Sequence, residues 1–166
     1  TPLHLFTCSK VPSAGQRALR SLTALTNLFL TGNDTVTDEV LRAASSLTAL
    51  TSIHFSGCAV VTNEGLRVLS SLTALTSLHL FTCSKVTSEG QRALRSLTAL
   101  TNLFHTGNDT VTDEVLRAAS SLTALSSIHF SGCAGVSNGG PPVRTSRTAL
   151  NSLLPPGRAQ RTRAWP

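Results

Sequence analysis

The sequence predicts an α/β solenoid, in which one short strand and one short helix recur along a single coiled path. Two observations predict it. A 25-residue pattern runs through residues 1–140, and within each copy two apolar residues two apart precede a stretch with helical spacing. We expect a right-handed solenoid with a parallel β-sheet on its concave face and short helices on its convex face.

Five copies of the pattern follow one another without a break. They occupy residues 1–25, 26–50, 51–75, 76–100 and 101–125, here called repeats 1 to 5, and repeat 6 begins at residue 126. A longer period overlies this one, because residues 76–140 differ from residues 1–65 at only eight positions. Recent duplication explains that identity, and so does misassembly of a repetitive gene.

The pattern decays after residue 140. Arginines stand at the two positions where repeat 3 has Leu69 and Leu72, and a buried arginine without a partner is costly. Consecutive prolines also exclude a helix start there. We therefore expect a repeat domain over residues 1–140 and a degenerate last repeat with a disordered, Arg/Pro-rich tail over residues 141–166. A frameshift would leave the same trace.

The net charge of +6 belongs to the tail and not to the repeats. Residues 141–166 contain five arginines and no acid, whereas residues 1–140 contain nine basic residues against eight acidic ones. The repeats therefore lack the electrostatic footprint of a nucleic-acid-binding surface. No apolar run is long enough to span a bilayer.

Location is indicated only indirectly. No signal peptide is visible, but the chain starts at Thr1 and contains no methionine, so we expect the natural start to be missing. The cysteines form no CxxC pair, which predicts buried, reduced thiols and leaves a disulfide or a metal as the alternative. They are Cys8, Cys58, Cys83 and Cys133. A cytoplasmic location is favoured, and the localisation itself stays open.

The strand of repeat 4 illustrates which side chains of one copy point into the core and which point outward. Leu78 and Leu80 are two apart, so both point inward, while Ser77, His79 and Phe81 point outward. One strand of this kind cannot bury a core alone. Stacked copies can, because each new strand covers the previous one.

A helical turn is expected over residues 87–97, with Ala93, Leu94 and Leu97 on its buried side. Glutamates of the helical segments precede arginines by three residues, which predicts weak ion pairs on a solvated convex face. The pairs are Glu39 and Arg42, Glu64 and Arg67, Glu89 and Arg92, and Glu114 and Arg117.

The pattern L-x-x-L-x-L-x-x-C-x-x-V-T-x-x-G resembles the leucine-rich repeat family, in the cysteine-containing subtype of F-box leucine-rich repeat proteins. In repeat 4 it is carried by Leu75, Leu78, Leu80, Cys83, Val86, Thr87 and Gly90. The resemblance implies a protein-interaction scaffold. For the subtype it implies the substrate-recognition part of an F-box ubiquitin ligase, although the sequence contains no F-box.

Asn33 and Asn108 stand where the other repeats have cysteine, as is normal in the wider family. Each begins an N-D-T sequence, which matches a glycosylation acceptor. Because the aligned cysteines are expected to be buried, we expect these amides to hydrogen-bond the loop backbone and to carry no glycan.

Aromatic and imidazole rings gather in outward columns of the predicted sheet. His4, Phe29, His54, His79, Phe104 and His129 share one outward position, and Phe6 and Phe81 stand in the next column. One interpretation is a docking strip for a protein or peptide, with some pH sensitivity from imidazoles near their ordinary pKa. The other, weighed evenly, is strand residues chosen for sheet propensity.

Catalytic and metal sites are not predicted. His54 and His79 supply two imidazoles without a third ligand, and no nucleophile elbow or phosphate loop is present. His105 replaces an inward residue that is leucine at positions 30 and 80. We interpret it as a core substitution that weakens repeat 5.

The leading hypothesis is a non-enzymatic scaffold that binds another protein or peptide on its concave face, with no cofactor and no small-molecule substrate. One alternative is polyanion binding through the arginine-rich tail. Another is a truncated, non-functional copy, because neither end of the repeat array carries a cap.

Overall fold

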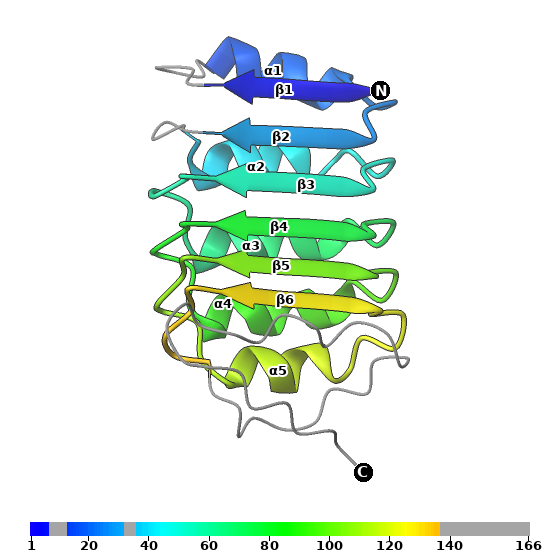
Figure 1. Cartoon of the computed structure of the whole chain (residues 1–166). Coiled ribbons are helices and arrows are strands. Elements are labelled where there is room, and N and C mark those ends of the chain that lie inside the picture. Colours follow the sequence, from blue (N-terminus) through cyan, green and yellow to red (C-terminus); the bar gives the residue numbers. More distant parts are fainter. Residues whose placement is uncertain (7–12, 32–35, 137–166) are drawn as a thin grey trace.

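Six short strands lie side by side in one parallel sheet, in the order in which they occur along the chain (Figure 1). A computed structural model describes residues 1–6, 13–31 and 36–136. The strands are β1 (Pro2–Phe6), β2 (Asn27–Thr31), β3 (Ser52–Ser56), β4 (Ser77–Phe81), β5 (Asn102–Thr106) and β6 (Ser127–Ser131). The register pairs every strand residue with the residue 25 positions later, as His54 with His79. The sequence period is therefore the spatial period, and the predicted fold class is confirmed.

Each described repeat before β6 returns to the sheet through a short helix on one side of it (Figure 1). The helices are α1 (Ser13–Ser21), α2 (Asp38–Ala44), α3 (Asn63–Val68), α4 (Ser88–Gln91) and α5 (Glu114–Ala119), with 3₁₀ turns η1 (Leu69–Ser71) and η2 (Arg92–Ser96). Thr62 and Thr87 cap α3 and α4, since each hydroxyl accepts a hydrogen bond from the N–H two residues later. The sheet face that points away from these helices is the concave face.

The core lies between the sheet and the helices. In β2 to β6 the second and fourth residues are buried and the others are half-buried, as period-two alternation predicts. Leu94 and Leu97 are buried as expected. The expected helix face needs one correction, because Gln91 is fully buried whereas Ala93 is only half-buried. The helical segment divides into α4 and η2, and Ala93 lies in η2, after the helix geometry has changed.

Ion pairs on the convex face join neighbouring repeats as well as residues of one helix. Two of the expected pairs form within a helix, Arg42 with Glu39 and Arg67 with Glu64. Three further pairs cross between repeats, and they are Arg42 with Glu64, Arg67 with Glu89, and Arg92 with Glu114. Such exposed pairs each contribute little. Their direction is regular, from the arginine of one repeat to the glutamate of the next.

Three cysteines of the described ranges lie in the turns that follow β3, β4 and β6. Cys58 and Cys83 are fully buried, and Cys133 is half-buried. The Cys58 thiol donates to the carbonyl of Leu30, and the Cys83 thiol to that of Phe81. Burial, with Cys58 nearby, raises the pKa of Cys83 to about 12. The prediction of buried thiols is confirmed for Cys58 and Cys83.

Asn108 takes the cysteine's place in repeat 5 and bonds the loop backbone in two directions. Its Oδ1 accepts from the N–H of Cys83 at 2.6 Å, and its Nδ2 donates to the carbonyl of Leu80 at 2.7 Å. Asn108 is buried, so the prediction of a structural amide is confirmed. Asn33 and Cys8 lie outside the described residues, as does the tail predicted over residues 141–166.

No helix among the described residues is long and apolar enough to cross a membrane.

Candidate functional site

A continuous row of rings crosses the concave face, one from each strand. The row consists of His4, Phe29, His54, His79, Phe104 and His129 and is called the ring ladder here. Successive ring centroids lie 4.3, 5.6, 4.5, 4.3 and 5.8 Å apart. The spacing follows from the parallel register, which places the same outward position of every strand beside its neighbour. The predicted column of rings is thus present in the structure.

Phe81 widens the ring ladder at its centre. Its ring centroid lies 5.0 Å from that of His54 and 5.9 Å from that of His79. All three side chains are half-buried, so their rings contact one another and still reach solvent. Phe6, the corresponding residue of β1, is paired in register with Thr31.

Burial keeps the central imidazoles neutral. Desolvation lowers the pKa of His54, and desolvation together with the charge of His54 lowers the pKa of His79 to about 4. The hydroxyl of Ser77 lies 3.0 Å from Nε2 of His79. The expectation that the imidazoles titrate near their ordinary pKa is therefore wrong for His54 and His79.

The columns on either side of the ring ladder are mostly polar and carry no ionisable side chain. Beside the rings stand Pro2, Asn27, Ser52, Ser77, Asn102 and Ser127 on one side, and Phe6, Thr31, Ser56, Phe81, Thr106 and Ser131 on the other. None of the strand positions carries Asp, Glu, Lys or Arg. The concave face thus offers rings, hydroxyls and amides to a partner without presenting a fixed charge.

The two central imidazoles of the ring ladder lie close together without a third metal ligand. Within residues 1–6, 13–31 and 36–136 no three His, Cys, Asp or Glu side chains gather closely enough to hold a metal ion. The rings of His54 and His79 stack within 13° of parallel and do not converge on a common point.

Two polar side chains are fully buried in the core, His105 as the sequence predicts and Gln91 without being predicted. His105 is fully buried, and both of its ring nitrogens lack a hydrogen-bond partner among the described residues. Its ring stacks on Phe130 at 5.5 Å, and burial lowers its pKa to about 3. Gln91 is likewise fully buried with its amide unpartnered. Leucine at the same position of repeats 2, 3 and 5 was the signal that could have revealed the burial of Gln91.

The chain has a fold similar to that of a solved structure. No model of a known protein family matches the chain, and no curated protein matches it. Among solved structures the chain is similar to internalin C2 from Listeria monocytogenes, with a TM-score of 0.64 and 21% sequence identity. The match covers 82% of this chain and 63% of the internalin chain, so the chain spans less than two thirds of that protein. At this identity the likeness shows a shared fold.

Proposed function

Starting from the leucine-rich repeat fold that the chain shares with this internalin, we propose that the protein is a non-enzymatic scaffold that binds another protein or peptide on its concave face. The observation that carries the proposal is the ring ladder, a continuous row of rings that contact one another across all six strands and reach solvent. Repeat arrays present extended surfaces of this kind to their partners.

The stacking supports binding because it fixes the rings in advance. His54, His79, Phe81 and Phe104 each touch at least one other ring, so little side-chain freedom remains to be lost on contact. Neutral imidazoles also avoid the cost of desolvating a charge. The neighbouring serine and asparagine side chains supply hydrogen bonds around this centre, as the rim of a protein interface does.

The test places charge at the centre of the ring ladder. In the double variant His54→Glu/His79→Glu, two carboxylates would have to be buried by the partner, so we expect at least a tenfold loss of captured partner. The matched control is Thr98→Glu/Thr123→Glu, which adds the same charge at exposed positions outside the strands. Partner capture is quantified by mass spectrometry and folding by circular dichroism. Equal capture by the folded double variant and the control would disprove the concave-face assignment.

The narrower role, as the substrate-recognition part of an F-box ubiquitin ligase, rests only on the cysteines at the turn position. The internalin neighbour lends it no support. Polyanion binding through the tail concerns residues outside the described ranges and stays a prediction, as does a cytoplasmic location.

A further inference from the structure

The ring ladder repeats with the period of the sheet, and this period restricts the conformation of a peptide that lies along it. Successive ring centroids are 4.3 to 5.8 Å apart. These distances scatter around the ordinary strand spacing of about 4.8 Å. A peptide that runs across the strands therefore meets one ring about every 4.8 Å and every second ring after about 9.6 Å.

Among the regular conformations of a peptide, the polyproline II helix matches this period best. It has three residues per turn and rises about 3.1 Å per residue, so the same side returns after about 9.3 Å, close to two strand spacings. An α-helix returns after about 5.4 Å. Along the whole ring ladder the α-helix would fall out of step by about 3 Å, against about 1 Å for polyproline II. A β-strand returns after about 6.6 Å, which matches neither one nor two spacings.

The rings of the ladder present their edges to a partner. His4 and Phe29 stack within 4° of parallel, and His79 and Phe104 stack within 10°. Because stacked rings cover the faces of their neighbours, it is mainly the ring edges that face solvent. Ring edges carry the positive part of the aromatic quadrupole, so they favour electronegative atoms such as carbonyl oxygens.

Two asparagines beside the ring ladder add hydrogen-bond donors to the same face. Oδ1 of Asn27 accepts from the hydroxyl of Thr26 at 2.7 Å, and Oδ1 of Asn102 accepts from the hydroxyl of Thr101 at 2.6 Å. Among the described residues, Nδ2 of neither asparagine has a hydrogen-bond partner. Both side chains are half-buried, so their amide nitrogens can reach the carbonyl oxygens of a bound peptide.

We propose that the partner bound on the concave face is an uncharged, proline-rich segment in the polyproline II conformation, which runs across the strands along the ring ladder. The inference rests on the proposed function and names the class of its partner. A polyproline II segment has no internal hydrogen bonds, and each proline adds a carbonyl without an N–H, so the segment needs donors. Its conformation is formed before binding, which lowers the entropic cost. The strand positions carry no Asp, Glu, Lys or Arg to pair with a charged partner.

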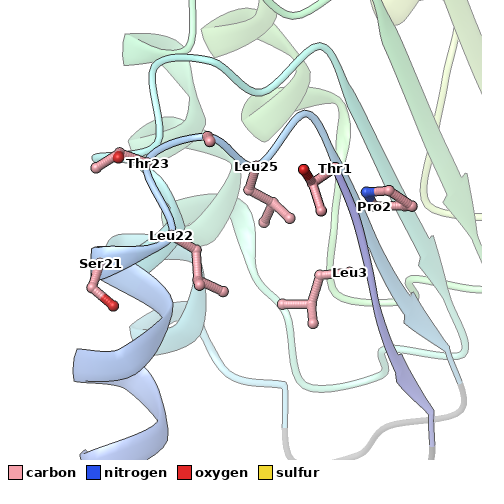
Figure 2. Close-up of a pocket in the computed structure, with 8 residues that line it drawn as sticks. Thr1, Pro2, Leu3, Ser21, Leu22, Thr23 and Leu25 are labelled. Atoms are coloured by element: carbon pink, nitrogen blue, oxygen red, sulfur yellow. The ribbon is translucent and has the colours of Figure 1, made fainter.

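A second apolar surface has to be separated from the ring ladder in any binding experiment. Figure 2 shows a hollow of about 380 Å³ between the start of β1 and the turn after α1, lined by Leu3, Leu22 and Leu25. Leu3 and His4 are consecutive residues of β1, so they point to opposite faces of the sheet. The hollow therefore lies on the core side, and a substitution of Leu22 controls for binding there.

The test titrates the full chain with three uncharged, fluorescently labelled peptides and follows their anisotropy. One is an oligoproline of about nine residues, which spans the ring ladder. The second is an alanine- and glutamine-rich helix of about 20 residues, long enough to form in water. The third is a threonine- and valine-rich peptide of about nine residues, which favours a strand. We expect the dissociation constant of the oligoproline to be at least tenfold lower than those of the other two.

Variants of the chain test the donors. Asn27→Asp/Asn102→Asp keeps the oxygens that accept from the threonines and replaces both donors by acceptors, so we expect oligoproline binding to weaken at least tenfold. Thr98→Asp/Thr123→Asp adds the same charge at exposed positions outside the strands and should leave binding unchanged. Leu22→Ser, in the hollow, should also leave it unchanged. Circular dichroism checks that each variant is folded.

Four results would overturn the inference. They are no oligoproline binding, binding of the helical or the strand-forming peptide as tight as that of oligoproline, equal oligoproline binding by Asn27→Asp/Asn102→Asp and the natural chain, and loss of binding in Leu22→Ser. Failure of the proposed function is a separate outcome. If His54→Glu/His79→Glu still loses its partner while oligoproline does not bind the natural chain, the concave-face scaffold stands and only the proline-rich partner is disproved.

Discussion

Leu30 and His105 occupy the same place in two nearly identical blocks, residues 1–65 and 76–140. Both side chains are fully buried, although the imidazole leaves two nitrogens unpartnered among the described residues. The other seven differences lie in the first 14 or the last 15 residues of a block. The comparison teaches that the repeated majority of leucines specifies the fold, and that a single polar residue in the core leaves the register of the strands unchanged.

Among these predictions, we expect acidic pH to produce the largest difference in stability, between the natural chain and a variant in which leucine replaces His105 as in the first block. The pKa of His105 falls from 6.5 in the unfolded chain to about 3 in the folded one, so between these values the unfolded chain holds a proton that the folded chain excludes. Stability is therefore lost as pH drops below 6.5, by about 1.4 kcal/mol per unit. From pH 6.5 to 4.5 the stability gap between His105→Leu and the natural chain should widen by about 2 kcal/mol, measured by urea denaturation. A gap that stays constant with pH would mean that the imidazole is not sealed in the core.

At neutral pH the same substitution should already stabilise the protein. His105→Leu removes two unpartnered buried nitrogens, and we expect a gain of about 2 kcal/mol in the free energy of unfolding. The reciprocal change Leu30→His should cost a similar amount in the first block. Hydrogen exchange would localise each effect. Repeat 5 of the natural chain exchanging as slowly as repeat 4 would contradict the interpretation that His105 weakens it.

Gln91 allows the same comparison of a polar residue with leucine, with a smaller expected change in stability. Repeats 2, 3 and 5 place Leu41, Leu66 and Leu116 at the position where repeat 4 buries an unpartnered amide. Gln91→Leu should therefore stabilise the protein by about 1 to 2 kcal/mol. Urea denaturation measures the gain, with the exposed Arg95→Leu as a control for added apolar surface. No gain, or a loss, would show that an unseen partner satisfies the amide.

The smallest expected change in stability comes from a residue in the turn that follows β4. Thr82 has φ of +49°, where Gly57, Gly107 and Gly132 stand in other repeats with φ between +63° and +67°. Thr82→Gly would relieve a left-handed conformation that β-branched residues disfavour. It would also remove the hydroxyl that accepts from the N–H of Gly57, and it adds freedom to the unfolded chain. We expect a net gain of about 0.5 kcal/mol in thermal denaturation, and a clear loss would mean that the hydroxyl outweighs the strain.

Much of the fold was predictable because the same local sequence pattern recurs in every repeat. Leu78 and Leu80 predict an inward-facing strand, and five aligned copies turn that local signal into a register of 25 residues. The alignment of Asn108 with buried cysteines predicted its role for the same reason. The positions of the ring ladder followed directly from strand alternation.

What could not be predicted depends on how neighbouring repeats are offset. The pair between Arg67 and Glu89 joins residues 22 apart, and it needs the spacing of stacked helices that no single repeat reveals. The lowered pKa of His79 arises from burial and from the charge of His54 on the neighbouring strand. Each is a property of the junctions between repeats.

The parallel register has a mechanical consequence. In the described part of the chain, the contacts of strand with strand and of helix with helix join elements of the same or adjacent repeats. Tension applied through the ends would therefore break the contacts of one repeat with its neighbour at a time. The other repeats could stay folded while one repeat detaches. Extension of such a chain should be stepwise, with each step releasing 25 residues, or about 80 Å of extended chain. We expect the repeat that contains His105 to unfold at the lowest force.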